Sequence, residues 1–224
     1  MFLGHYGVAL AAKRAAPETS LGWTVLASQW LDLLWPILLL VGVERVRIEP
    51  GLMPASALNF THYPLTHSLL TVLGWGVLVG LVYWLTKRRA RGAMLLAALV
   101  VSHWLLDAVV HRPDLPLWPG SDVLVGAGVW RSAGLTIALE FAFLAGGLAV
   151  YAKTTRPDDA VGRWGLWAMS LLLAVFFLSS FAGPPPSVSA LAYGGLSLWL
   201  FVPWAAWVDR HRSPRHAAPS PEET

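Results

Sequence analysis

The chain has 224 residues, of which 56% are hydrophobic and only 13% are charged, and its mean hydropathy is +0.56. These values exclude an ordinary soluble domain and indicate a polytopic membrane protein. Cysteine is absent, which excludes disulfides and thiolate metal sites. The net charge of +3 gives no reason to expect a nucleic-acid partner, because the basic residues lie at the ends of apolar segments.

The order of apolar segments predicts an all-α fold, a polytopic transmembrane helical bundle. Residues 2–12 are apolar but too few to cross a membrane, so we expect a short N-terminal re-entrant helix there. Residues 1–208 are expected to form a single domain, with a metal-site half over about 1–115 and scaffold spans over 131–208. The polar, proline-containing residues 209–224 predict a disordered cytoplasmic tail. Six stretches are long enough to cross a hydrocarbon core of ~30 Å, namely 22–43, 66–86, 91–111, 131–152, 164–183 and 187–208.

The lysine and arginine residues predict the orientation of these spans. Twelve lie on one side of the membrane and four on the other. The positive-inside rule places the twelve in the cytoplasm, so that the loops at 44–65 and 112–130 face outward. The two sets are Lys13, Arg14, Lys87, Arg88, Arg89, Arg91, Lys153, Arg156, Arg163, Arg210, Arg212 and Arg215 on the cytoplasmic side, and Arg45, Arg47, Arg112 and Arg131 on the other.

Ionisable side chains inside the apolar segments are the strongest functional signal. His103 and Asp107 are four residues apart, so they project from one face of a helix. Asp32, His67 and His5 reach similar depths from other segments, given a rise of ~1.5 Å per helical residue. A carboxylate at membrane depth costs several kcal/mol unless it is compensated, and such residues are usually functional.

Imidazole and carboxylate groups in this arrangement predict a divalent metal site for one or two ions. The ligands suit zinc, with manganese or iron as alternatives. A catalytic ion lowers the pKa of its bound water to ~7 and so enables hydrolysis. The predicted ligands are His5, Asp32, His67, His103 and Asp107, and either Asp32 or Asp107 could also act as the catalytic general base.

Other readings of these residues stay open. His103 and Asp107 could be a hydrogen-bonded pair that joins two helices, and Asp32 could pair with Gln29 or an indole. Glu140 lies in the middle of a span and needs a partner, which could be a metal. His111, at the membrane edge, could be a further ligand or simply solvated. His62 precedes the His67 helix and could touch a substrate or belong to an ordinary outer loop.

The motifs around these residues resemble the YdjM-like family of predicted membrane-bound metal-dependent hydrolases of bacterial inner membranes. The shared features are Gly4-His5, the Asp32 that follows Gln29-Trp30-Leu31, the block Thr66-His67-Ser68-Leu69-Leu70, and Ser102-His103 followed by Asp107. The resemblance covers about residues 1–115 and implies metal-dependent hydrolysis. The ligand order is also similar, more weakly, to that of zinc-dependent phospholipases C and related single-strand nucleases, in which His111 and Glu140 would match the last two ligands.

Together these patterns predict an inner-membrane hydrolase that uses metal-activated water. A site in the outer half of the bilayer suits an ester or phosphoester of a lipid or a lipid-linked substrate. A transporter or channel for metal ions or protons is the first alternative, and a structural membrane protein is the second. The transporter would need polar positions that continue to the cytoplasmic face, and the sequence has few beyond Asp32. The oligomeric state stays open.

Overall fold

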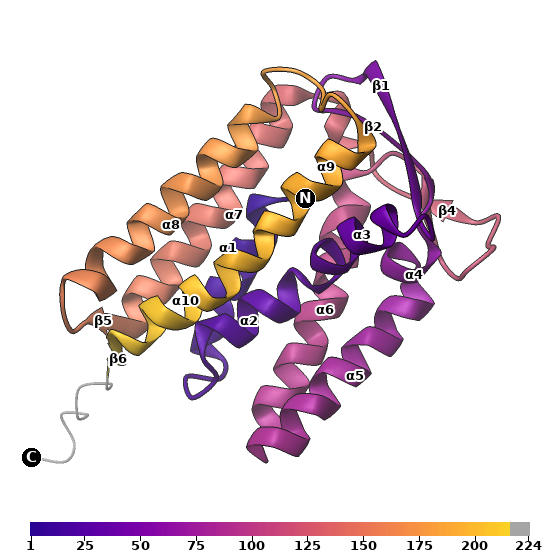
Figure 1. The fold of residues 1–224 in the computed structure, drawn as a ribbon. Coiled ribbons are helices and arrows are strands. Elements are labelled where there is room, and N and C mark those ends of the chain that lie inside the picture. Colours follow the sequence, from indigo (N-terminus) through magenta and orange to yellow (C-terminus); the bar gives the residue numbers. More distant parts are fainter. Residues whose placement is uncertain (216–224) are drawn as a thin grey trace, which may run out of the picture.

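The computed structural model of the protein describes residues 1–215, and its membrane-spanning architecture confirms the predicted all-α bundle (Figure 1). Within these residues, five helices are long and apolar enough to cross a membrane, and a bent pair of shorter helices, counted as one span, makes six. The spans are α2–α3 (Leu21–Ser28 and Trp30–Leu40), α5 (Leu69–Lys87), α6 (Ala90–Val110), α7 (Ala133–Thr154), α8 (Ala160–Ser179) and the last span, which comprises α9 (Val188–Leu196), η3 (Ser197–Leu200) and α10 (Phe201–Arg210).

Helix α1 (Leu3–Ala11) is the expected short N-terminal helix, and it lies inside the bundle. It packs along α7 and against α2, and a 3₁₀ turn, η1 (Ala12–Arg14), follows it. The contact with α7 is close because both helices have a glycine there. A Cβ added to Gly7 would lie 2.2 Å from the carbonyl oxygen of Phe143, and one added to Gly147 would lie 2.0 Å from that of Gly7. Backbones can approach this closely only where side chains are absent.

One end of the bundle carries short strands that the sequence did not predict, and we call it the hairpin end. Strands β1 (Arg45–Met53) and β2 (Ser56–His62) form an antiparallel hairpin after α3. A four-residue helix, α4 (Pro64–His67), then leads into α5. Between α6 and α7, β3 (Leu115–Pro116) pairs with β4 (Leu124–Val125), and the turn η2 (Val129–Arg131) follows. These segments cover the ends of the spans (Figure 1).

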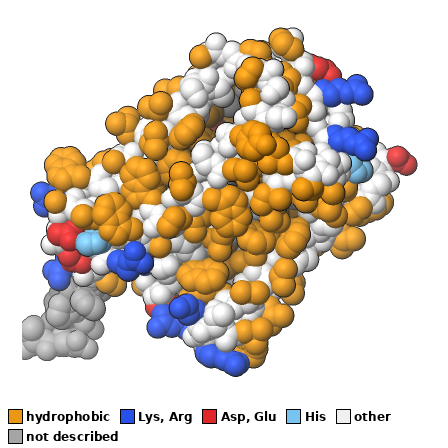
Figure 2. Space-filling view, viewed as in Figure 1, with side chains coloured by type: hydrophobic (Ala, Val, Ile, Leu, Met, Phe, Trp, Pro, Cys, Tyr) orange, Lys and Arg blue, Asp and Glu red, His pale blue; other side chains and the backbone are white. Residues whose placement is uncertain are grey.

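The opposite end, which we call the basic end, is held by a buried ion pair. Lys13 Nζ lies 2.6 Å from Asp209 Oδ2, and the same carboxylate accepts hydrogen bonds from Leu21 N (3.0 Å) and Tyr151 Oη (2.7 Å). Most basic side chains lie at this end, and hydrophobic side chains cover the surface between the two ends (Figure 2). The pair fixes the start of α2, the end of α7 and the end of α10 against the turn after α1.

The predicted disordered tail is wrong for residues 209–215. Helix α10 continues to Arg210, and β6 (Arg212–Pro214) pairs with β5 (Thr155–Pro157). The buried carboxylate of Asp209 explains the extension, because its three polar contacts require an ordered helix end. The rest of the predicted tail, residues 216–224, lies outside the described residues.

A candidate metal centre

Helix α6 contributes two of the site residues, as its sequence spacing predicts. His103 and Asp107 lie one turn apart, and both are buried, at 0% and 2% exposure. His103 Nε2 lies 3.2 Å from Asp107 Oδ2. The two side chains therefore face the same interior point, close to the hairpin end of the helix.

A break between α2 and α3 places the next residue, Asp32. The two helices meet at Gln29 with a bend of 53°, and no proline or glycine stands at the break. The carbonyl oxygen of Ser28 accepts a hydrogen bond from His103 Nδ1 at 2.7 Å. Asp32 then falls in the first turn of α3, where the positive end of the helix dipole favours a carboxylate. Its Oδ1 lies 3.6 Å from His103 Nε2.

His67 ends the short helix α4 and is oriented through a chain of hydrogen bonds. Glu44, which is 1% exposed, accepts the backbone N–H groups of Leu65 and Thr66 at Oε1 (2.8 and 2.9 Å) and the Thr66 hydroxyl at Oε2 (2.7 Å). Because the hydroxyl donates to Glu44, it accepts from His67 Nδ1, 2.7 Å away. His67 Nε2 thus points toward Asp107 Oδ2 (3.4 Å) and Asp32 Oδ1 (3.9 Å).

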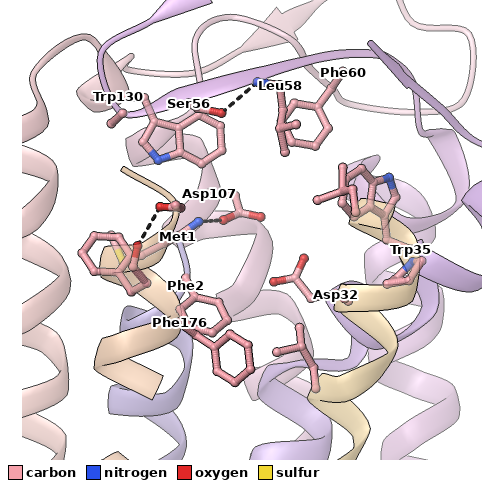
Figure 3. Close-up of a pocket in the computed structure, with 18 of the residues that line it drawn as sticks. Met1, Phe2, Asp32, Trp35, Ser56, Leu58, Phe60, Asp107, Trp130 and Phe176 are labelled. Carbon is pink, nitrogen blue, oxygen red and sulfur yellow. Dashed lines mark hydrogen bonds and ion pairs between the residues drawn. The ribbon is translucent and has the colours of Figure 1, made fainter. Parts of the chain in front are cut away.

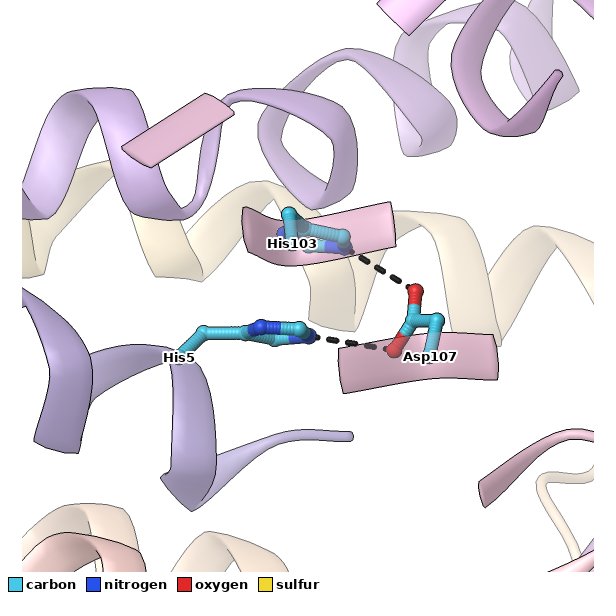
Figure 4. Close-up of side chains that lie close together, drawn as sticks. All are labelled: His5, His103 and Asp107. Atoms are coloured by element: carbon cyan, nitrogen blue, oxygen red, sulfur yellow. Dashed lines mark hydrogen bonds and ion pairs between the residues drawn. The ribbon is translucent and has the colours of Figure 1, made fainter. Parts of the chain in front are cut away.

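His5 of α1 joins the cluster, which agrees with the depth expected for it from the sequence. Its ring stacks on that of His103, with centroids 3.6 Å apart and planes 8° from parallel. Figure 4 shows the two rings directed at different oxygens of Asp107, with His5 Nε2 3.2 Å from Oδ1. The terminal ammonium group of Met1 also contacts Oδ1. Asp107 therefore lies at the middle of the cluster.

Two overlapping sets of three residues each have the spacing of ligands around a divalent cation. Two sets have ligand atoms that all lie within 4.8 Å of one another: Asp32, His67 and His103, and His5, His103 and Asp107. The four distances that link Asp32 and Asp107 with His67 and His103 are 3.2–3.9 Å, and tetrahedral ligands at ~2.1 Å from zinc are separated by about 3.4 Å.

The proton positions in the two imidazole rings add a second argument. A carbonyl oxygen can only accept, so His103 carries its proton on Nδ1, and the Thr66 hydroxyl fixes the same tautomer in His67. Their Nε2 lone pairs then face carboxylate oxygens. His103 Nε2 is buried and has no hydrogen-bond partner among the described residues. A lone pair that faces a carboxylate is repelled, so either a second proton on Nε2 or a metal cation between the two groups has to join them. The second case is the arrangement of metal-bound histidines.

The three additional candidates lie outside this group. Glu140 accepts the backbone N–H groups of Phe2 (2.8 Å) and Gly4 (2.9 Å), so it caps the start of α1. His111 is not solvated at the membrane edge, because it is 2% exposed and donates from Nδ1 to Asp114 Oδ1 at 2.9 Å. His62 is exposed at the end of β2.

Sequence reasoning missed Glu44, which orients His67 through Thr66, and Asp114, which holds His111 beside the centre. Asp114 binds His111 and also accepts from the Tyr63 hydroxyl at 3.0 Å. Burial and the carboxylate of Asp114 raise the pKa of Tyr63, so this hydroxyl stays a donor. Both acids follow the apolar spans in the loops at the hairpin end, where carboxylates are usually solvated. One sequence feature could have suggested the role of Glu44: it is an acidic residue directly after the span at 22–43, in the loop that leads to Thr66-His67.

A cavity of about 390 Å³ leads away from the centre (Figure 3). Asp32, His67 and Asp107 lie on its wall, and the Asp32 side chain, at 24% exposure, is the most accessible of them. Trp130, Ser56 and Phe60 cover it on the hairpin side, while Phe2 and Phe176 lie opposite. His5 and His103 are almost fully buried behind this wall. The centre therefore has a closed side formed by histidines and an open side at Asp32.

The re-entrant helix, the broken span and the buried histidines and aspartates define a polytopic membrane protein with a polar centre inside the bilayer region. Comparison with known protein families shows to which family the chain belongs. The chain belongs to the YdjM inner membrane protein family, whose model matches residues 1–183. This range includes every residue of the centre and extends into the loop after α8. No curated protein and no solved structure shows significant similarity to the chain.

Proposed function

We propose that the protein is a metal-dependent hydrolase of the inner membrane that acts on an ester or phosphoester of a lipid or lipid-linked substrate. The main supporting observation is the paired orientation of His67 and His103, whose Nε2 atoms converge on two carboxylates while their Nδ1 atoms are held by acceptors. Asp32, His67, His103 and Asp107 would hold the ion, which we expect to be zinc.

The chain's own residues then have separate tasks. His5 holds Asp107 Oδ1, so the other oxygen stays directed at the two histidines; its predicted role as a ligand stays a prediction. A divalent cation in this place would supply Lewis acidity and make water reactive at neutral pH. Asp32, the most exposed carboxylate on the cavity wall, would act as the general base that accepts a proton from water. The largely apolar cavity excludes bulk water from the ester.

The position of the centre supports a lipid substrate. Asp107 and His103 lie three and seven residues from the hairpin end of α6, which corresponds to depths of about 5 and 10 Å. The positive-inside rule, which keeps the basic end in the cytoplasm, puts this depth in the outer half of the membrane. An ester near a lipid headgroup lies at a similar depth.

Metal analysis of the purified protein tests the proposal. We expect about one zinc ion per chain in the wild type and none in His103→Ala or Asp107→Ala, together with turnover of a phospholipid or phosphodiester reporter that a chelator abolishes. Tyr193→Ala is the control, because this side chain is 66% exposed and does not line the cavity. A folded wild type without stoichiometric metal after incubation with zinc would rule the proposal out.

A further inference from the structure

The cavity continues from the metal centre toward two helices of the second half of the chain. Phe176 of α8 and Ser180, the C-cap residue of that helix, line it on one side, and Ala190 and Gly194 line it from α9. Each pair is separated by four residues, so each forms one stripe on its helix. The two stripes form the walls of a slot that begins at the centre.

The slot opens sideways because α8 and α9 do not pack closely together. Helix α9 packs on α3, where Gly195 meets Pro36, and α8 packs on α10. Within the described part of the chain, α8 and α9 share few contacts. They are joined at the hairpin end by a loop that contains Gly183 and three prolines (Figure 1). Phe176 lines the cavity and is also 41% exposed, so it lies where the slot meets the outer surface of the bundle.

The walls of the slot suit hydrocarbon. The Ser180 hydroxyl donates to Phe177 O at 2.7 Å, and the Ser197 hydroxyl donates to Gly194 O at 2.6 Å. Both hydroxyl protons are therefore used within their own helices, and the remaining lining of the slot is apolar. The cavity volume of about 390 Å³ is at the small end of the usual range for ligand sites, roughly 300–1,000 Å³. It has room for one chain beside the centre and not for a whole lipid.

We infer that the slot between α8 and α9 is a lateral entrance that binds one acyl chain of a membrane lipid and so brings that lipid's ester to the metal centre. That the ester is hydrolysed at the centre rests on the proposed function. That the acyl chain binds in the slot does not. An acyl chain fits because the entrance lies at the depth of the lipid tails, is apolar, and is continuous with the cavity that Asp32 and Asp107 line.

Photolabelling in nanodiscs tests this directly. The probe is a phosphatidylcholine with a diazirine in one acyl chain, and labelled positions are mapped by mass spectrometry. A Cβ added to Gly194 meets nothing within 4 Å, so a side chain at this cavity-lining position starts in open space, and Gly194→Trp is the variant chosen to fill the slot. Gly74→Trp is the matched control, because Gly74 is exposed, also has open space at its Cβ, and lies at a similar depth in α5.

We expect labelling of the wild type to concentrate on residues 173–180 and 190–198. Gly194→Trp should reduce it about tenfold, since an overpacking cost of ~1.4 kcal/mol is a factor of ten in binding, and Gly74→Trp should leave it unchanged. Labelling spread evenly over the lipid-facing surface, or equal labelling of Gly194→Trp and the wild type, would overturn the inference.

Zinc binding and thermal unfolding, measured on the same samples, separate the two proposals. Labelling of the slot without zinc binding supports the acyl-chain site and contradicts the proposed metal centre. Zinc binding without slot labelling contradicts the chain site and leaves the metal centre standing. An unchanged unfolding temperature in Gly194→Trp shows that a loss of labelling does not come from misfolding.

Discussion

The substitution Glu44→Gln tests whether the hydrogen bonds around His67 prepare it to bind the proposed cation. A carboxylate accepts at both oxygens, whereas a carboxamide accepts at one end and donates at the other. If the amide oxygen keeps the N–H groups of Leu65 and Thr66, the amide nitrogen donates to the Thr66 hydroxyl. That hydroxyl then turns its proton toward His67 Nδ1, and the ring proton moves to Nε2, where it faces the carboxylates.

The expected loss of zinc affinity can be estimated because the hydrogen bonds that join Glu44, Thr66 and His67 are buried. Changing a residue that orients a metal-binding histidine typically lowers metal affinity 10- to 100-fold, which corresponds to about 1.4–2.7 kcal/mol. If the amide turns the other way, its nitrogen faces two backbone donors, and the cost of about 1–3 kcal/mol falls on the stability of α4. Because Glu44 is 1% exposed, water cannot relieve either conflict.

Competition with a zinc chelator in detergent micelles measures the affinity, and ¹⁵N NMR of the imidazole nitrogens reports the tautomer. Thr66→Ser keeps the hydroxyl and should behave as the wild type. Thr66→Val removes it and should weaken zinc binding as Glu44→Gln does. A folded Glu44→Gln protein with unchanged zinc affinity and an unchanged His67 spectrum would refute the proposed role of this chain of contacts.

Three further predictions concern the scaffold and the ion. Lys13→Met leaves the buried Asp209 carboxylate without its cation and should destabilise the protein by about 3–5 kcal/mol, which would appear as a lower unfolding temperature. Adding Asp209→Asn to this variant removes the unpaired charge and should partly restore the unfolding temperature. Gly7→Leu cannot keep the close contact with α7 and should lower stability and zinc affinity together, whereas Gly146→Leu, with open space at its Cβ, should change neither. Free zinc at 100 times its Kd should stabilise the wild type by about 2.7 kcal/mol, and an equal shift in His103→Ala would contradict the assigned centre.

The sequence predicted the spans and the gathering of the five principal residues well. Long apolar runs specify membrane helices because each needs about 20 residues to satisfy its backbone in lipid. His103 and Asp107 share a face by spacing alone. The depth of His5 was predictable from its distance to Lys13, because the helix that carries it is too short to span and Lys13 fixes its end at the basic end of the bundle. Whether these residues bind a metal stays a prediction.

The break at Gln29 and the environment of His111 could not be predicted in the same way. The break has no helix-breaking residue, and the carbonyl of Ser28 is occupied by an imidazole 75 positions away in the chain. His111 is buried because Trp130 packs on it at 4.2 Å between centroids and Phe60 of the hairpin at 4.9 Å. Both features depend on contacts between segments that are far apart in the sequence. The pattern of neighbouring residues carries no information about such contacts.

The arrangement on the far side of the centre favours chemistry over transport. A transporter needs polar groups or an opening between the centre and the other membrane face. Here α1 and α2 fill that direction: Tyr6 and Leu10 of α1 and Leu21 and Val25 of α2 are at most 1% exposed, and the polar side chains of Thr24 and Gln29 are fully buried among them. Beyond them, Lys13 and Asp209 are bound to each other and to backbone groups. An ion at Asp32 would therefore meet a packed core on one side and the cavity on the other. Such a pocket, closed at one end, suits a substrate that enters and leaves by the same side.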